Sequence, residues 1–417
     1  MQSCRPATTG ARGHERPLPI VRVEKLFKVF GRRPAEAVRR LETGIDRKEL
    51  DPGVTAAVID ASFTVERGEI FVVMGLSGSG KSTLLRTLNG LLPATSGRVL
   101  VDEQDLTTLS PAQVRELRQQ RMSMVFQHFA LFPHRTVAEN VAYGLSVQGA
   151  PRERQLSRTA EALELVGLAG WEDRLPGELS GGMRQRVGLA RALAADTEIL
   201  LMDEAFSALD PLIRKEMQDQ LLILQRQLGK TIVFITHDLN EAMRLGDRIA
   251  MMRDGRIVQV ATAQEMLTAP ADEYVTKFVR DVDRTRVLTA ATVMEPAGVS
   301  FTTDTSPAQA RETMLGHELT GALVIEAGKF AGSVTRGAVS AAAERGDATL
   351  AEAVDREAAR TAPETPVADL FGVSASAPAP VAVVDGDGGL LGMVTQQSLL
   401  RSLSIPENAE EEVDAHA

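Results

Sequence analysis

The stretch Gly75-Leu76-Ser77-Gly78-Ser79-Gly80-Lys81-Ser82 decides the fold class of this chain of 417 residues. It follows the apolar run Ile70-Phe71-Val72-Val73-Met74 and precedes a helical pattern, so the spacing G-x4-G-K-S stands in the context of a phosphate-binding loop. Glycine residues let such a loop wrap a phosphate with the backbone N–H groups pointing inward. We therefore expect a nucleotide at this loop.

The side chains and backbone of the loop are expected to hold ATP and Mg²⁺. Lys81 would bring a positive charge to the β and γ phosphates, and the Ser82 hydroxyl would reach Mg²⁺. The positive end of the helix that follows would face the same anion. The loop residues expected at the nucleotide are Gly75, Ser77, Gly78, Ser79, Gly80, Lys81, Ser82 and Thr83.

A second apolar run, Ile199-Leu200-Leu201-Met202, ends in Asp203 and Glu204. Open α/β sheets bind ligands at the carboxyl ends of their strands, where these acids would emerge. Asp203 would hold Mg²⁺ through water, and Glu204 would polarise the attacking water as general base. The alternative is a strand with a solvated acidic end, and the phosphate-binding loop upstream argues against it.

The segment Leu179-Ser180-Gly181-Gly182-Met183-Arg184-Gln185 begins another glycine-rich helix. Ser180 could be an ordinary N-cap, or the helix start could bind an anion. The segment resembles the signature motif of ABC ATPases, which simpler P-loop ATPases lack. The resemblance implies that Ser180, Gly181 and Gly182 of one subunit face the γ-phosphate held by the loop of another. ATP would then bind between two subunits.

Other motifs of that family follow in order along the chain. Gln127, in Val125-Phe126-Gln127-His128, is similar to the glutamine that contacts Mg²⁺ and the attacking water. His237 resembles the switch histidine at the γ-phosphate, and Asp210, in Ser207-Ala208-Leu209-Asp210, matches the loop that crosses the dimer interface. The resemblance therefore implies three catalytic residues, Glu204, His237 and Gln127.

The chain is expected to contain two folded regions. Alternating apolar strands and helical stretches between residues 70 and 255 predict an α/β fold with a mainly parallel sheet. Together with the resemblance, they indicate a P-loop ABC ATPase domain with a helical subdomain at 20–283, followed by a tandem CBS-like α+β region at 284–404. Residues 1–19 are predicted to be a disordered N-terminal tail, and 405–417 an acidic tail.

A weak internal repeat, at a lag of about 60 residues, supports the tandem region. Leu323-Val324 corresponds to Val383-Val384, and Gly332-Ser333-Val334-Thr335 corresponds to Gly392-Met393-Val394-Thr395. A duplicated β-α module would account for the same order of elements. The repeats resemble a pair of CBS domains, at about 284–345 and 346–404.

The CBS resemblance leaves the role of the pair open. Adenosine-binding CBS motifs place an aspartate three residues after the threonine, where this chain has Ala338 and Ser398. Binding of an adenine nucleotide is therefore disfavoured. Sensing of ionic strength and stabilisation of a dimer are the preferred alternatives.

The resemblance narrows to the ATPase subunits of bacterial osmoprotectant importers and covers nearly the whole chain. This narrower resemblance rests on two stretches, the insertion Gly31-Arg32-Arg33-Pro34-Ala35-Glu36-Ala37 and the pair Ala205-Phe206. It implies ATP-driven import of glycine betaine, choline or proline betaine, with an ABC ATPase for another solute, or a non-transport ABC ATPase, as alternatives. The aromatic residue that stacks on adenine is assigned to Phe30, with Phe27 as rival because of the insertion.

The resemblance also implies partners and a location. We expect a homodimer that contacts transmembrane permease subunits, works indirectly with a periplasmic or lipid-anchored substrate-binding protein, and lies peripherally at the cytoplasmic face of the inner (plasma) membrane. No apolar run reaches the roughly 18 residues of a membrane span. The single cysteine, Cys4, fits a reducing cytoplasm, and the net charge of -10 argues against a nucleic-acid partner.

Overall fold

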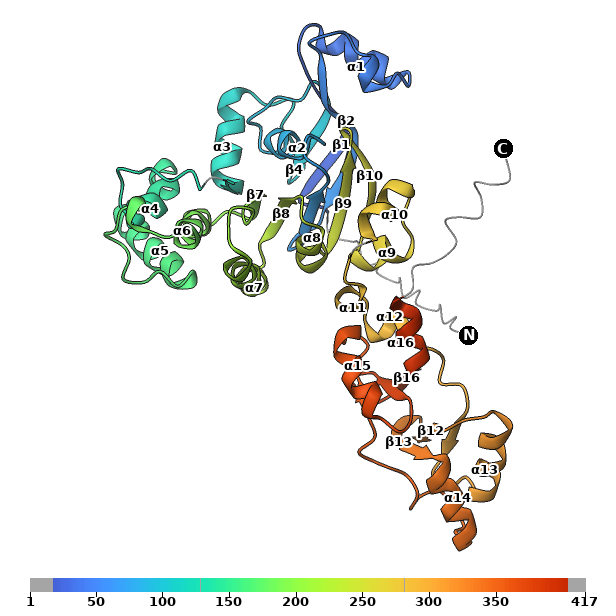
Figure 1. Cartoon of the computed structure of the whole chain (residues 1–417). Coiled ribbons are helices and arrows are strands. Elements are labelled where there is room, and N and C mark those ends of the chain that lie inside the picture. Colours follow the sequence, from blue (N-terminus) through green and yellow to red (C-terminus); the bar gives the residue numbers. More distant parts are fainter. Residues whose placement is uncertain (1–17, 128, 281, 404–417) are drawn as a thin grey trace, which may run out of the picture. The chain divides into compact units, whose positions relative to one another are not determined.

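The computed structural model describes residues 18–127, 129–280 and 282–403. The chain divides into two compact units, Met1–Ala263 and Gln264–Ala417, which Figure 1 colours from blue to yellow and from yellow to red. The predicted acidic tail, Cys4 and all but the last two residues of the predicted N-terminal tail lie outside the described residues. Along the described residues, no helix is long and apolar enough to cross a membrane.

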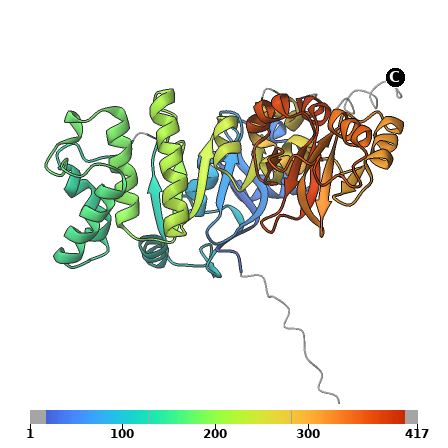
Figure 2. The ribbon, with the colours of Figure 1, turned by 90° about the horizontal axis from the view of Figure 1, so that it is seen from below.

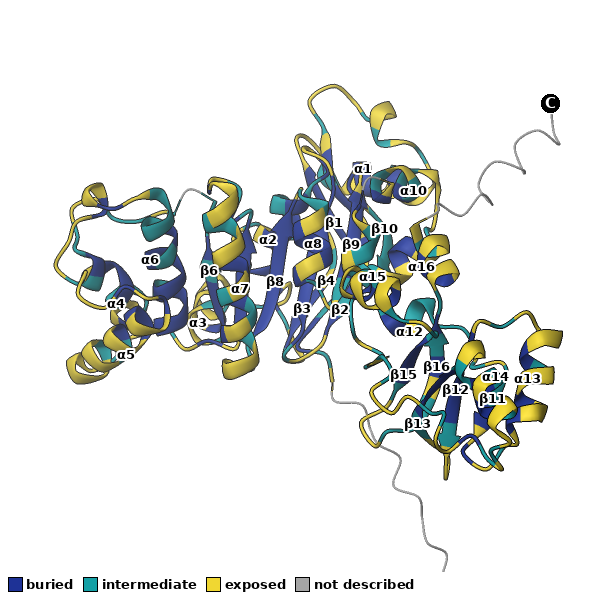
Figure 3. Cartoon of the chain, turned by 60° about the horizontal axis from the view of Figure 1, so that its bottom comes forward, coloured by how far each residue is buried: buried dark blue, intermediate teal, exposed yellow. Residues whose placement is uncertain are grey.

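A six-stranded sheet forms the centre of the first unit, in the order β10-β9-β3-β8-β7-β6. Its neighbours pair in parallel except β9 and β10, which are antiparallel. Every residue of β3, β7 and β8 is buried, as the continuous apolar runs predict for strands covered on both faces (Figure 3). The strands are β3 Ile70–Met74, β6 Met122–Val125, β7 Ile199–Asp203, β8 Thr231–Thr236, β9 Arg248–Arg253 and β10 Arg256–Ala261.

A second, antiparallel sheet runs in the order β2-β1-β4-β5. The stacked rings of Phe63 and Phe71, with centroids 5.0 Å apart, join it to the central sheet. The residues from Thr55 to Val65 form one continuous strand, β2, which pairs with β1 across several register shifts. The strands are β1 Val21–Phe30, β2 Thr55–Val65, β4 Ser96–Val101 and β5 Gln104–Asp105.

The inserted segment between β1 and β2 folds back onto the start of this sheet. Helix α1, Pro34–Glu42, begins at Pro34, a position where proline is favoured because the first turn needs no backbone donor. Its buried residues Ala37, Val38 and Leu41 pack against Phe27 in a small separate core. A short 3-10 helix, η1, Arg47–Glu49, follows it.

Three helices, α4, α5 and α6, form a cluster beyond strand β6 (Figures 1 and 2). Helix α5 begins at Arg152, and helix α6 begins at Gly181, directly after its N-cap Ser180. The remaining helices of the unit lie around the central sheet. The helices are α2 Lys81–Leu88, α3 Pro111–Arg121, α4 Val137–Val147, α5 Arg152–Leu165, η2 Pro176–Glu178, α6 Gly181–Ala194, α7 Pro211–Leu228 and α8 Leu239–Leu245.

The second unit contains two three-stranded sheets, β11-β12-β13 and β14-β15-β16. In each, the first pairing is parallel and the second antiparallel. The strands are β11 Ser300–Thr302, β12 Gly321–Glu326, β13 Lys329–Thr335, β14 Arg360–Thr361, β15 Val381–Val384 and β16 Leu390–Val394. The helices are α9 Ala263–Thr268, which starts at the unit boundary, α10 Glu273–Val279, α11 Arg284–Val287, α12 Ala290–Val293, α13 Pro307–Gly316, α14 Arg336–Arg345, α15 Val367–Ser376 and α16 Gln396–Leu403.

The internal repeat corresponds to a repeated hairpin followed by a helix. Gly332 pairs with Val324 in the first hairpin, and Gly392 pairs with Val383 in the second. The predicted match of Leu323-Val324 with Val383-Val384 is therefore wrong by one residue, because the stretch from Val383 to Gly392 is one residue longer than the stretch from Val324 to Gly332. The helices α14 and α16 follow β13 and β16, as predicted.

Candidate functional site

The phosphate-binding loop is shaped by glycines that no other residue could replace without strain. Gly80 is the N-cap of α2 at φ 104°, and it makes no side-chain cap. A Cβ at Gly80 would lie 2.0 Å from the carbonyl oxygen of Ala57, and one at Gly75 would lie 2.1 Å from that of Met252. The loop backbone at Gly75 and Gly80 is thus in close contact with Met252 and Ala57. The first N–H groups of α2 have no side-chain cap. Such a helix start is suited to bind an anion.

Lys81 lies directly under this loop and is only 4% exposed. Its Nζ donates hydrogen bonds to the carbonyl oxygens of Gly75, at 2.8 Å, and Leu76, at 3.1 Å. Burial lowers the pKa of Lys81, while the carboxylates of Glu204 and Asp203 act in the opposite direction. The lysine is therefore held in place by the same loop that it would assist in binding phosphate.

Two of the three predicted metal ligands, Ser82 and Asp203, meet at the edge of the loop. Asp203, the buried last residue of β7, accepts a hydrogen bond of 2.8 Å from the Ser82 hydroxyl. The Arg86 guanidinium lies 3.8 Å from the other oxygen of Asp203. A hydroxyl and a carboxylate held together in this way match the oxygen ligands that Mg²⁺ prefers, so the donor set fits this ion.

The three predicted catalytic residues converge on one oxygen atom. Gln127 Nε2 donates a hydrogen bond to Glu204 Oε2 at 3.2 Å, and His237 Nδ1 lies 3.2 Å from the same oxygen. Glu204 itself adopts φ 46°, a conformation that is strained for a residue other than glycine. Gln127 follows β6 and His237 follows β8, the strands on either side of β7. The sheet order therefore explains why residues so distant in sequence meet.

A cavity of about 530 Å³ joins the loop to these residues. Its lining comes from the phosphate-binding loop, from the start of β2, from the inserted segment and from two of the catalytic residues. The lining residues are Arg47, Val54, Thr55, Ala56, Ala57, Ser77, Gly78, Gly80, Lys81, Ser82, Thr83, Gln127 and Glu204. The shape leaves room for a ligand that extends from Glu204 along the loop toward the inserted segment.

The glycine-rich start of α6 does not belong to this cavity. None of Ser180, Gly181, Gly182 and Asp210 is among the described residues that line it. Ser180 and Asp210 are exposed helix caps, and they accept hydrogen bonds from the backbone N–H of Met183, at 3.3 Å, and of Ile213, at 3.1 Å. Within one chain, the structure therefore does not bring these four predicted residues to the nucleotide site.

The amino-acid sequence is similar to known proteins over nearly its whole length. Residues 58–207 match the family model described as ABC transporter. The glycine betaine/carnitine transport ATP-binding protein of Listeria monocytogenes is 47% identical over 92% of this chain and 97% of its own length. The chain belongs to the ATP-binding subunits of glycine betaine ABC transport systems.

Two further comparisons agree with this assignment. The glycine betaine transport ATP-binding protein of Bacillus subtilis is 46% identical to this ATP-binding subunit, over 94% of the chain and 93% of the relative. The dimeric post-hydrolysis structure of the ATP-binding cassette MJ0796 bound to ADP and Pi is 30% identical, with a TM-score of 0.50 over 58% of this chain and 98% of that cassette. The subunit is an ATPase with the P-loop ABC fold predicted for it.

The structure distinguishes the two aromatic candidates for adenine in the ATP-binding subunit. Phe27 is 3% exposed and belongs to the small core under α1, whereas Phe30, the last residue of β1, is 40% exposed. Phe30 pairs with Thr55, which lines the cavity, and Lys28 Nζ lies 4.9 Å from the centre of its ring. Exposure next to the cavity favours Phe30, because a stacking ring must be accessible.

The sequence analysis did not identify a group of buried residues whose hydrogen bonds fix the backbone on both sides of His237. The buried Glu241 accepts hydrogen bonds from the Thr236 hydroxyl and, at 3.0 Å, from Gln218 Nε2. The Thr236 hydroxyl in turn accepts a bond of 3.0 Å from the N–H of Asp238. The residues on both sides of His237 are thus fixed by one buried carboxylate. The stretch after His237 gave only a family match, without any sign that Glu241 would be buried.

Arg214 and Arg47 were also missed. Arg214 donates to the carbonyl oxygen of Leu209 at 3.0 Å and to Asp238 at 3.4 Å, which links the loop before α7 to the loop after β8. Arg47 comes from the inserted segment and lines the cavity. Neither position carries a recognisable motif, since each contact depends on how distant elements pack.

Proposed function

We propose that this subunit hydrolyses ATP to drive the import of a quaternary amine osmoprotectant of the glycine betaine, choline or proline betaine type. The meeting of Gln127 and His237 at Oε2 of Glu204, beside the phosphate-binding cavity, carries the hydrolytic part of the proposal. The proposed solute follows from relatives that match nearly the whole chain and are named for the transport of glycine betaine. Transport of another solute is the second candidate.

The residues have separable roles in hydrolysis. Backbone N–H groups at the start of α2 and the Lys81 ammonium hold the β and γ phosphates. Glu204 accepts a proton from the attacking water, and Gln127 and His237 orient that water and the γ-phosphate. Because phosphoryl transfer to water requires little covalent chemistry from the protein, catalysis rests on positioning and charge.

The proposed metal site consists of three oxygen donors. The Ser82 hydroxyl, the Asp203 carboxylate and the amide oxygen of Gln127 would hold Mg²⁺, which neutralises charge on the β and γ oxygens when it is bound. The hydrogen bond of 2.8 Å between Ser82 and Asp203 supports this assignment.

A second copy of the chain would complete each site. Ser180, Gly181, Gly182 and Asp210 lie outside the cavity of their own chain, and Ser180 and Asp210 are exposed. In the proposed homodimer they face the γ-phosphate bound by the partner. ATP then holds the two subunits together, and hydrolysis allows them to separate.

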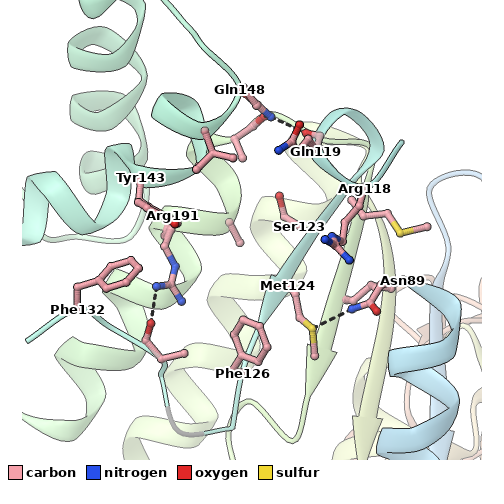
Figure 4. Close-up of a pocket in the computed structure, with 17 residues that line it drawn as sticks. Asn89, Arg118, Gln119, Ser123, Met124, Phe126, Phe132, Tyr143, Gln148 and Arg191 are labelled. Atoms are coloured by element: carbon pink, nitrogen blue, oxygen red, sulfur yellow. Dashed lines mark hydrogen bonds between the residues drawn. The ribbon is translucent and has the colours of Figure 1, made fainter. Parts of the chain in front are cut away.

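Transmembrane permease subunits would dock beside Gln127. A second cavity, of about 360 Å³, lies between β6 and the helical cluster, with aromatic walls from Phe126, Phe132 and Tyr143 (Figure 4). Arg191 donates hydrogen bonds to the carbonyl oxygens of Phe129, at 2.9 Å, and Ala130, at 2.7 Å. A coupling helix seated here would sense the segment that follows Gln127.

This docking would fix the location of the subunit. It would lie peripherally at the cytoplasmic face of the inner (plasma) membrane, with a periplasmic or lipid-anchored binding protein on the other side. The permease and the binding protein, rather than this chain, would then select the solute.

The second unit is proposed to be a CBS pair, at about 284–345 and 346–404, with a regulatory or dimer-stabilising role. Its repeated hairpins support this proposal. Ser398 occupies the position of the ribose-binding aspartate in adenosine-binding CBS motifs. Its hydroxyl donates to the carbonyl oxygen of Thr395 and accepts from the N–H of Thr395, both at 3.0 Å. A role in adenine-nucleotide binding is therefore not part of the proposal.

Turnover of the Glu204→Gln variant tests the catalytic assignment. We expect ATP-dependent dimerisation to persist while the hydrolysis rate falls by at least about 100-fold, because the general base is lost but the nucleotide contacts remain. Dimerisation can be followed by size-exclusion chromatography with ATP. Turnover like that of the wild type would refute the assignment of Glu204 as general base.

A further inference from the structure

The inserted segment contributes a cation to the nucleotide cavity. Among the described residues that line this cavity, two are cationic, Lys81 and Arg47. Lys81 lies under the phosphate-binding loop, whereas Arg47 lies in η1, after the inserted helix α1. Arg47 is therefore the one lining cation that the proposed mechanism does not use.

Arg47 is held in position by the turn that also braces the phosphate-binding loop. Its guanidinium lies 3.1 Å from Oδ1 of Asp254, in the turn between β9 and β10. The next residue, Gly255, donates to the carbonyl oxygen of Ser79 at 3.1 Å and accepts from the N–H of Ile59 at 2.8 Å. Arginine, turn and loop thus form one connected unit.

The inserted segment itself is stabilised around η1. Asp46 caps η1 by accepting a hydrogen bond of 2.8 Å from the N–H of Lys48. Arg40 of α1 donates to Asp51 and to the carbonyl oxygen of Glu49, both at 3.0 Å. The position of Arg47 is therefore set by its own segment as well as by Asp254.

We propose that Arg47 is a nucleotide-binding residue whose guanidinium pairs with the α-phosphate of ATP. The proposal rests on the proposed nucleotide site and deepens it. Phe30, the favoured adenine-stacking residue, pairs with Thr55, which lines the same cavity as Arg47. The α-phosphate is the anionic group nearest the base, and the β and γ phosphates belong to Lys81.

The chemistry of arginine allows this role alongside its contact with Asp254. A guanidinium has five N–H donors, so an ion pair with one carboxylate leaves donors for a phosphate oxygen. Asp254 also lies 3.5 Å from Arg253, which reduces its repulsion of a bound nucleotide. Asp254 then acts as a positioning residue for Arg47.

The Arg47→Ala variant of the full chain tests the proposal by nucleotide titration. We expect the affinity for MgATP to fall about 10-fold to 100-fold, as for loss of a charge-assisted hydrogen bond. MgGTP affinity should fall by the same factor, because the contact is made to phosphate and not to the base. The loss should shrink as salt is raised and should appear in KM rather than in kcat.

Matched variants keep the outcome interpretable. Arg47→Lys retains the charge and should recover part of the affinity, whereas Arg39→Ala removes an exposed arginine of α1 outside the cavity lining and should change nothing. Unchanged MgATP affinity in Arg47→Ala, or a loss for MgATP without one for MgGTP, would overturn the proposal. Lys81→Ala distinguishes a failure of the role proposed for Arg47 from a failure of the proposed nucleotide site. If Lys81→Ala abolishes binding of MgATP while Arg47→Ala leaves it unchanged, only the role of Arg47 fails. If Lys81→Ala also binds normally, the proposed nucleotide site itself fails.

Discussion

Two glycine-rich helix starts in the first unit look alike in sequence and differ in structure. The start of α2 is packed from outside by Ala57 and Met252, and its N-cap, Gly80, makes no side-chain bond. At the start of α6, Ser180 is exposed and caps the helix, and Gly181 and Gly182 are partly buried. The first leaves its N–H groups for a phosphate, whereas the second has satisfied part of its own need for an acceptor.

This difference suggests that the two helix starts of one chain belong to two different nucleotide sites. The start of α2 would bind the phosphates in its own chain, and the start of α6 would complete the site of a second copy. The loop at the start of α2 is shaped by its own chain, so we expect it to bind ATP without a partner. The start of α6 lies outside the nucleotide cavity of its own chain, and in the proposed homodimer it would meet the phosphate bound by the second copy. Binding and turnover should therefore respond differently to changes at the two starts.

The largest expected effect separates the two starts by matched glycine substitutions. Gly80→Ala places a Cβ 2.0 Å from a carbonyl oxygen at φ 104°, so the loop must distort. We expect nucleotide affinity of the isolated chain to fall by more than about 100-fold, because the cradle is lost. Equilibrium binding of a fluorescent ATP analogue measures this.

Gly181→Ala is the matched variant at α6. A Cβ at Gly181 meets nothing within 4 Å, so the fold and the binding of ATP to the isolated chain should be preserved while turnover falls. If both variants lost ATP binding to the same extent, the distinction between the two starts would be wrong.

The loop at the start of α2 could be predicted because the residues that form it are adjacent in sequence, whereas its packing against Ala57 and Met252 could not. Glycines, Lys81 and Ser82 are adjacent, and the strand before them is a plain apolar run. Asp203 and Glu204 could be predicted for the same reason, because they directly follow the apolar run of β7. A motif that is complete within ten or so residues needs no knowledge of the tertiary fold.

Features that depend on packing between distant segments could not be predicted. Arg47 reaches the cavity only because α1 packs on Phe27 and η1 follows it back. The left-handed backbone of Glu204 gives no sequence signal. Phe30 and Phe27 were left as rivals because both are aromatic and three residues apart, and only their burial distinguishes them.

Mixing two inactive variants tests whether each nucleotide site is shared between two copies of the chain. Lys81→Ala disables the cradle of one chain, and Ser180→Arg disables the α6 start of the other. In a two-fold symmetric heterodimer, one site carries both changes and the other carries neither, so equal mixing should restore up to about a quarter of wild-type turnover. Each variant alone should be inactive. A mixture that stays as inactive as its components would contradict the shared site.

A smaller effect distinguishes a cap from a binding residue. Ser180→Ala should cost about 1 kcal/mol of unfolding free energy, because the N-cap bond to Met183 is lost, and it should also lower turnover. Ser110, the capping-box residue of α3, offers the matched control. Ser110→Ala should cost a similar amount and leave turnover unchanged. Equal turnover in the two variants would reduce Ser180 to a structural cap; thermal melts and ATPase assays decide between the outcomes.

The smallest change that we expect concerns a third helix start, that of α8, which is capped by the side chain of Asp238. Asp238 caps it through the N–H groups of Asn240, at 2.9 Å, and Glu241, at 3.2 Å. Burial raises the pKa of Glu241, and Asp238 adds to that rise, while the bonds from Thr236 and Gln218 and the charge of Arg214 act against it. This start therefore contains a buried acid that binds its proton more tightly in the folded chain than in the unfolded chain.

The sign of the pH dependence follows from that difference. Between the ordinary glutamate pKa, about 4.3, and the raised pKa of Glu241, the folded chain binds more protons, so stability falls as pH rises. Glu241→Gln is uncharged throughout and should melt with a flatter dependence on pH across that window. The exposed Glu161 of α5 provides the control, since Glu161→Gln should leave the slope unchanged. An identical slope in Glu241→Gln and the wild type would mean that α8 is closed without a proton on its buried acid.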